Sequence, residues 1–185
     1  LVAWREEAGR EKRAAFRDQE YWARPVPGFG DPEAELLIVG LAPAAHGGNR
    51  TGRIFTGDRS GDWLFRALYR AGYANQPTSV SRDDGLELRG AYIAAAGRCA
   101  PPQNRPTTEE AVTCRPYLVR EYALLERVRV VVALGSFALA AVASLTGTRP
   151  RPRFGHGAEA VLADGRRLVC SFHQSQQNTF TGKLT

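Results

Sequence analysis

The segment that decides the fold is residues 36–58, LLIVGLAPAAHGGNRTGRIFTGD, where an apolar run passes directly into a glycine-rich segment. The run predicts a short buried strand over residues 35–39. Residues 40–58 then contain five glycines and end on the carboxylate of Asp58. Because glycine lets the backbone approach a flat or phosphorylated ligand closely, this segment is typical of a binding loop. A plain surface connection between a strand and a helix is the alternative.

Strand and helix patterns alternate along the rest of the chain. Short apolar runs predict further strands over residues 91–96, 128–134 and 168–172. Helices are predicted over residues 1–17, 62–71, 107–125 and 136–145, the third of them opened by a capping pattern at Thr107–Glu110 and kinked or divided at Pro116. This alternation predicts an α/β fold with a mostly parallel four-stranded sheet and helices on both of its faces.

Composition favours a globular protein with a phosphate-bearing partner. The chain has 185 residues, 43% of them hydrophobic, which is the size of one domain over residues 1–185. The net charge is +6, and all but two of the 25 basic residues are arginine. The arginine fork suits phosphate geometry, so nucleic acid is the favoured partner, although a genome biased toward arginine would give the same composition.

Several absences in the sequence give further expectations. No apolar stretch is long enough to span a bilayer and no secretory signal pattern is present, so a cytoplasmic protein is expected. The sequence contains no methionine and stops after a polar segment, which suggests a domain truncated at both ends. Three cysteines are an odd number, so a disulfide framework is not expected, and Cys170 should lie in the core.

The segments that follow the four predicted strands are the expected ligand-binding region, because ligands bind beyond the carboxyl ends of parallel strands. Three of these segments, residues 40–58, 98–104 and 173–178, are rich in polar and ring-bearing side chains. None contains the G-x-x-x-x-G-K-[ST] pattern of a P-loop, and no G-x-G-x-x-G follows the first strand. Nucleotide hydrolysis at a P-loop is thereby excluded, and a dinucleotide-binding fold is not expected.

Four residues in these segments are candidates for chemistry, and each has a structural alternative. Asp58 could be a catalytic carboxylate or a helix cap, and His173 a proton donor or a structural histidine. Asn104 could read the edge of a base, since an amide both donates and accepts, or could be a turn residue. Phe55 could be a stacking platform or a core residue.

Four motifs, in order over essentially the whole chain, resemble one family. GLAPAAHG, GRIFTGDRSG, RCAPPQNRPT and HQSQQNTFTGKLT are similar to the motifs of the family 5 (type B) uracil-DNA glycosylases. The resemblance implies a three-layer α/β/α sandwich of the uracil-DNA glycosylase superfamily. It also implies a monomeric DNA-repair enzyme, acting at the nucleoid, that hydrolyses the N-glycosidic bond of uracil and of some other deaminated bases. Double-stranded DNA is the expected substrate, with single-stranded DNA as a further candidate.

The resemblance assigns roles residue by residue. Asp58 matches the carboxylate that positions and activates the attacking water, and His173 the histidine that donates to the base oxygen. Phe55 matches the ring that stacks on the flipped base, and Asn104 the amide that reads the pyrimidine edge. The backbone turn lining the base pocket matches Leu41, Ala42, Pro43 and Ala44, and the loop pressing on the DNA matches Ser175, Gln176, Gln177 and Asn178.

The same family holds a [4Fe-4S] cluster on four cysteines. Cys99 and Cys114 match its second pair, and the first pair would lie upstream of Leu1. Residues 41–45 contain no acid or amide, which is typical of type B and assigns the activation of water to Asp58. Two rival functions remain: a catalytically inactive nucleic-acid-binding module of the same fold, and an enzyme acting on a free nucleotide or another small ligand.

Overall fold

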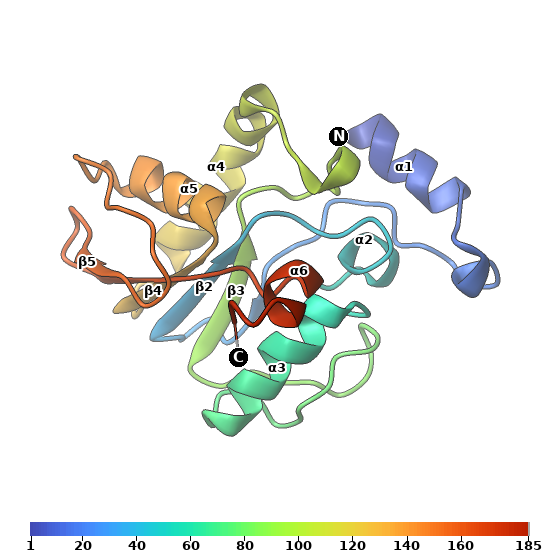
Figure 1. Cartoon of the computed structure of the whole chain (residues 1–185), viewed down its shortest axis with the longest axis horizontal. Helices are drawn as coiled ribbons and strands as arrows, with labels where there is room; N and C mark the ends of the chain where they lie inside the picture. The colour runs from blue at the N-terminus through green and yellow to red at the C-terminus, as the bar shows by residue number, and fades with distance from the viewer. Residues whose placement is uncertain (185) are drawn as a thin grey trace.

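The protein is built on a twisted sheet whose central strands are parallel. The computed structural model describes residues 1–184; Thr185 and the side chain of Gln176 lie outside the described part. The described residues form a six-stranded sheet of order β1-β3-β2-β4-β6-β5 (Figure 1). The four central strands are β3 (Ala91–Ala95), β2 (Leu36–Gly40), β4 (Val130–Leu134) and β6 (Arg167–Ser171), and each pairs in parallel with its neighbour.

The two edge strands were not predicted. β1 (Phe29–Gly30) and β5 (Glu159–Val161) pair antiparallel with β3 and β6 respectively. The sheet therefore has six strands instead of four, while the four parallel strands lie where the apolar runs placed them. Strands of two and three residues are too short to give an alternating pattern, and β5 has both ends exposed to solvent, so nothing in their sequence marks them.

Helices cover both faces of the sheet, which confirms the three-layer sandwich. α3 (Arg59–Arg70) lies on one face, and α4 (Thr108–Leu124) and α5 (Ser136–Thr146) lie on the other (Figure 1). The alternation within β2 explains this arrangement. Leu37 and Val39 belong to the core cluster under α4 and α5, and Ile38 between them belongs to the cluster under α3. Both faces of the strand are thus buried, as a central parallel strand requires.

Three helices differ from their predictions. The N-terminal helix, α1 (Val2–Arg10), ends seven residues before the expected position, and a separate 3-10 turn follows at Ala14–Phe16. α3 begins at Arg59, three residues before the predicted start, because Asp58 caps it. α4 continues through Pro116 without division, although its capping box at Thr107 and Glu110 is present as predicted.

Short helices occupy segments that were expected to be loops. These are α2 (Gly48–Thr51), the 3-10 turn Pro102–Asn104 and α6 (Gln176–Phe180). In Figure 1 α6 lies beside the first turn of α3, at the edge where the parallel strands end. Within residues 1–184, no helix combines the length and the apolar character that crossing a bilayer would need.

Candidate active site

A cavity of about 360 Å³ lies at the carboxyl ends of β2, β3 and β6. Three of the four predicted ligand-binding segments contribute to its wall, and the segment after β4 does not. The lining residues are Leu41, Ala42, Ala44, Phe55, Asp58, Arg59, Ser60, Asn104, His173 and Ser175. The structure thus brings together Asp58, Phe55, Asn104 and His173, which are separated by up to 118 positions in the sequence.

Asp58 is both the cap of α3 and a cavity-lining carboxylate. One oxygen, Oδ1, accepts a hydrogen bond of 3.0 Å from the backbone N–H of Gly61. The other oxygen lies against Gly47, where an added Cβ would be only 2.1 Å from Oδ2. Burial raises the pKa of Asp58 above its ordinary 3.8, although the hydrogen bonds from Gly61 and Ser60 oppose this shift. The two interpretations of Asp58 from the sequence are therefore compatible.

Phe55 is likewise both a core residue and part of the cavity wall. It is 6% exposed, belongs to the core cluster under α3, and has a left-handed backbone with φ of 53°. That conformation is strained for a bulky residue and persists only where the surroundings impose it. Gly40 and Gly61 leave room for it here: a Cβ at Gly40 would be 2.8 Å from the Phe55 ring, and one at Gly61 would be 1.8 Å from the Phe55 carbonyl oxygen.

The His173 ring lies beside the Phe55 ring at the end of β6. Their centroids are 5.9 Å apart and the planes are inclined by 36°. Burial lowers the pKa of His173 below its ordinary 6.5, so the imidazole is neutral at pH 7. A neutral imidazole retains one N–H, which can donate to a carbonyl oxygen in the cavity. The backbone carbonyl of His173 accepts a hydrogen bond of 2.7 Å from Asn178 Nδ2.

Asn104 lies at the exposed rim of the cavity. It ends the 3-10 turn Pro102–Asn104, and both Gln103 and Asn104 have left-handed backbones, with φ of 52° and 56°. The prediction of a turn is therefore correct, and the same turn directs Asn104 to the cavity.

Some predicted contact residues lie away from the cavity. Pro43 is buried and faces Gly48, where a Cβ would be 3.1 Å from the Pro43 Cβ, so it does not border the cavity as Leu41, Ala42 and Ala44 do. Asn178, which belongs to the loop expected to press on DNA, donates its amide Nδ2–H to the His173 backbone carbonyl and does not line the cavity. In the same segment Ser175 lines the cavity and Gln177 is exposed, whereas the side chain of Gln176 lies outside the described part.

The sequence analysis missed Arg59 and Ser60, which line the cavity from the first turn of α3. Placing the helix start at Asp58 would have revealed both. It also missed a second cavity of about 470 Å³ on the other side of Asp58, whose wall includes Arg13 and His46. The His46 ring is held by a hydrogen bond of 2.9 Å between its Nδ1 and the Tyr21 hydroxyl.

A buried ion pair holds the loop between Phe55 and Asp58 in place. Arg53 Nη2 lies 2.7 Å from both carboxylate oxygens of Asp84, and both side chains are less than 10% exposed. Arg53 also donates to the hydroxyls of Ser79 and Thr56, at 2.8 and 3.0 Å. This group of side chains, here called the Arg53 clamp, joins the loop after β2 to the loop that precedes β3.

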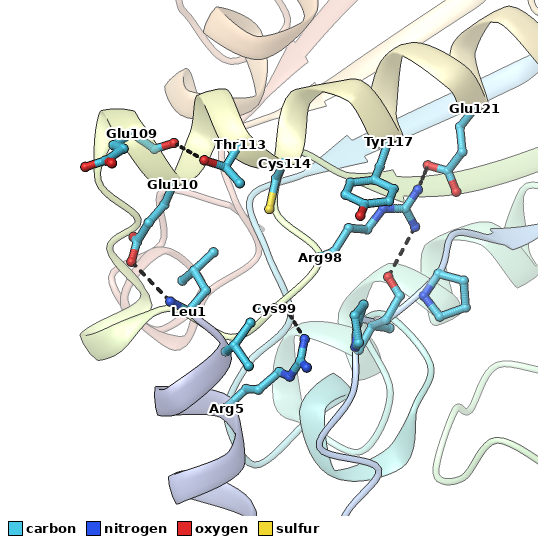
Figure 2. Close-up of a pocket in the computed structure, with 14 residues that line it drawn as sticks. Leu1, Arg5, Arg98, Cys99, Glu109, Glu110, Thr113, Cys114, Tyr117 and Glu121 are labelled. Atoms are coloured by element: carbon cyan, nitrogen blue, oxygen red, sulfur yellow. Dashed lines mark hydrogen bonds and ion pairs between the residues drawn. The ribbon is translucent and has the colours of Figure 1, made fainter.

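Cys99 and Cys114 meet at a third cavity, of about 590 Å³, between α1 and α4 (Figure 2). Both are buried and carry free thiols, and Figure 2 shows the sulfur of Cys114 directed from α4 into the cavity. Arg5 approaches from α1, and its Nη1 lies 2.9 Å from Cys99 Sγ. Four thiolates hold a [4Fe-4S] cluster, so these two thiols can supply at most half of such a ligand set. No group of three or more metal-binding side chains occurs in residues 1–184. Cys170 is 1% exposed in the core, as predicted.

The fold and the cavity define the class: an α/β protein whose parallel strands end in a pocket lined by aromatic, amide, imidazole and carboxylate side chains. A family model described as the Uracil DNA glycosylase superfamily matches residues 27–185. The chain is 57% identical to a type-5 uracil-DNA glycosylase of Mycobacterium leprae, over the whole chain and 82% of that protein. It is 55% identical to the type-5 uracil-DNA glycosylase of Thermus thermophilus, over the whole chain and 84% of that protein.

A type-4 uracil-DNA glycosylase of Thermotoga maritima is more distant, with 30% identity over 81% of the chain and 69% of that protein. The chain therefore belongs to the uracil-DNA glycosylase superfamily, and within it to the type-5 family, as its four motifs indicated.

Proposed function

We propose that this protein hydrolyses the N-glycosidic bond of uracil in DNA, with the uracil nucleotide flipped out of the helix into the 360 Å³ cavity. The observation that supports this function is the convergence of Asp58, Phe55, Asn104 and His173 on one cavity from three separate loops. The type-5 relatives, which cover the whole chain, are named for the same activity.

Each residue has a role that its surroundings suit. As the bond between the sugar and the base breaks, its electrons pass to the uracil ring, and the sugar becomes an oxocarbenium-like cation. The neutral His173 donates its N–H to the uracil oxygen on which this charge develops. Asp58 orients a water toward the sugar carbon and accepts its proton, through the oxygen that does not cap α3.

Binding of the flipped base is shared among the other residues. Stacking on the Phe55 ring contributes about 1–3 kcal/mol, which offsets part of the few kcal/mol that flipping costs. Asn104 at the rim reads the pyrimidine edge, and the backbone of Leu41, Ala42 and Ala44 lines the pocket. The segment from Ser175 to Gln177, including Gln176, contacts the DNA strand beside the base. Uracil-containing duplex DNA is the substrate, and the protein acts as a monomer.

Substitution of Asp58 tests this mechanism. Asp58→Asn removes the carboxylate but keeps the helix cap, because asparagine caps as well as aspartate. We expect single-turnover excision on a uracil duplex to fall at least 100-fold, while the Kd for that duplex changes less than threefold. Asp58→Ala, the comparison variant, should lose the cap as well and about 1 kcal/mol of stability. Undiminished abasic product from Asp58→Asn would refute the role of Asp58, and binding by the wild type without product would identify an inactive DNA-binding module.

We further propose that Cys99 and Cys114 are two ligands of a [4Fe-4S] cluster, completed by two cysteines upstream of Leu1. Their free thiols at one cavity support this, and thiolates are the usual ligands of such clusters. When bound, the cluster would cross-link the segment after β3 to α4.

Iron content and visible absorbance of a chain extended upstream test the cluster. Cys99→Ser and Cys114→Ser should each abolish the absorbance and bound iron, whereas Cys170→Ala, in the distant core, should keep both. Iron binding that survives both serine substitutions would contradict the assignment.

A further inference from the structure

The connection between α5 and β5 contains an unpaired run of positive charge. Arg149, Arg151 and Arg153 follow one another at every second position, and no aspartate or glutamate occurs between residues 147 and 158. All three arginines are exposed, and within residues 1–184 none of them forms an ion pair. The nearest carboxylate along the chain, Glu159, is already paired with Arg167 at 2.8 Å. The positive charge of this run is therefore not neutralised by the protein itself.

The run has a restricted backbone. Pro150 and Pro152 alternate with the three arginines, and each proline ring fixes φ near −65°. A segment restricted in this way loses less conformational entropy when its side chains bind a ligand.

The segment that follows the run, residues 154–157, is fixed against the carboxyl end of β6. The His156 ring stacks on the Phe172 ring, with centroids 5.3 Å apart and planes inclined by 13°. Phe154 packs against the same ring at 5.9 Å, and the Gly157 N–H donates to the Cys170 carbonyl at 2.8 Å. Phe172 directly precedes His173, so these contacts anchor the carboxyl-terminal end of the run on the β6 side of the cavity. At the other end of the run, the Thr148 hydroxyl accepts a hydrogen bond of 2.9 Å from the Ala163 N–H, in the turn at the amino end of β6, so the run extends along the edge of the sheet toward the cavity side.

We propose that residues 149–153 form an arginine arm along the β6 edge of the sheet that binds backbone phosphates of the DNA duplex flanking the cavity. The inference rests on the proposed function and adds to it a second DNA-contacting surface, separate from the segment that begins at Ser175. Guanidinium groups suit phosphate because they donate in a planar fork. The arm makes no contact with the base, so it contributes affinity and orientation and leaves the choice of base to the cavity.

The test uses the full chain with Arg149, Arg151 and Arg153 all changed to Gln. Fluorescence anisotropy on uracil-free duplex, over a range of salt concentrations, gives the slope of log K against log salt. That slope changes by about 0.9 for each phosphate that the protein no longer neutralises, so the triple variant should have a slope smaller by about 2–3. Its single-turnover excision rate at saturating DNA should stay within twofold of the wild type.

Two matched variants control for charge and for folding. Arg149, Arg151 and Arg153 changed to Lys keep the charge and should keep most of the slope. Arg70, Arg120 and Arg129 changed to Gln remove the same charge from exposed positions toward the amino ends of the strands, and should leave the slope unchanged.

The proposal that residues 149–153 bind phosphates would be contradicted if the Gln variant kept the wild-type slope. It would also be contradicted if the control at Arg70, Arg120 and Arg129 showed an equal decrease. These results are distinguishable from failure of the proposed function. In one such case, the wild type forms no abasic product while the Gln variant still shows a reduced salt dependence of DNA binding. That result would support the arginine arm and contradict the proposed glycosylase activity.

Discussion

Asp58 combines two tasks that depend on different atoms. Oδ1 accepts the hydrogen bond that caps α3, while Oδ2 lies next to Gly47, which has no side chain. The cap fixes the direction of a carboxylate that also lines the cavity. From the sequence the two roles looked like alternatives, because a sequence identifies a residue type and does not show which oxygen is engaged.

The raised pKa of Asp58 gives a prediction about pH. The carboxylate must be ionised to accept a proton from water, so the acidic limb of the excision rate should lie above pH 3.8, the ordinary value for aspartate. For stability the sign is opposite to that of a salt-bridged aspartate. A folded-state pKa above the unfolded value favours the native state at low pH, and this contribution is lost as pH rises through the folded-state pKa.

Denaturant unfolding of the wild type and of Asp58→Asn checks this prediction. The stability of the wild type relative to Asp58→Asn should decrease as pH rises from below 3.8 toward 7. A relative stability that instead increases over this range would mean that the pKa of Asp58 is lowered by folding.

At the scale of elements, the Arg53 clamp holds the loop that carries Phe55 and Asp58. In Asp84 burial has the largest influence and raises the pKa, but hydrogen bonds from Arg53 and from three backbone amides outweigh it, and the pKa is lowered. A buried charge that loses its partner is costly, by about 3–5 kcal/mol. The positions of Phe55 and Asp58 therefore depend on the ion pair that joins the loop after β2 to the loop before β3.

Arg53→Met should destabilise the protein by about 3–5 kcal/mol in denaturant unfolding, because it leaves the Asp84 carboxylate buried and unpaired. Arg167→Met is the matched control: it breaks the Arg167–Glu159 pair, whose side chains are 67% and 58% exposed, and should cost less than about 1 kcal/mol. Adding Asp84→Asn to Arg53→Met should recover part of the loss, since the unpaired charge is then removed. Equal effects of Arg53→Met and Arg167→Met would show that the clamp is not buried in solution.

The elements that the sequence predicted correctly are those with a clear hydrophobic pattern. The apolar runs of β2, β3, β4 and β6 mark strands because both faces are buried. The short helix α6 was missed, because five mostly polar residues give no apolar face to detect. The cap at Asp58 was misplaced because Asp62, one turn further on, satisfies the same rule for a helix start.

At the scale of the whole molecule, the sheet separates two cores that share no buried residue. The sequence indicates which strands are buried on both faces, but the cavity wall could not be derived from it. That wall depends on close approaches such as Gly61 to Phe55, which are set by how α3 packs on the sheet. The motif resemblance named Asp58, Phe55, Asn104 and His173 without that geometry, but not Arg59 or Ser60.

The two cores predict additive effects on stability. Ile93→Val, on β3 under α3, should cost about 0.5–1.5 kcal/mol, and Val142→Ala, on the buried face of α5, about 1.6 kcal/mol or more from the methyl groups removed. Because the sites lie on opposite faces of the sheet, the double variant should equal the sum within about 0.5 kcal/mol. Thermal or denaturant unfolding measures all three variants, and a large deviation would reveal strain transmitted through the sheet.

The convergence of three loops on one cavity also has a consequence for the order of folding. Its lining residues extend from Leu41 to Ser175, and they meet only after β3, β2, β4 and β6 have assembled into the sheet. Loop closure over such distances comes late in folding, because its entropy must be offset by strand pairing. A nascent or partly unfolded chain thus has arginines that attract DNA but no assembled pocket. We therefore expect the folding chain to bind DNA before it can excise uracil. Recovery of excision activity during refolding would report when the sheet is complete.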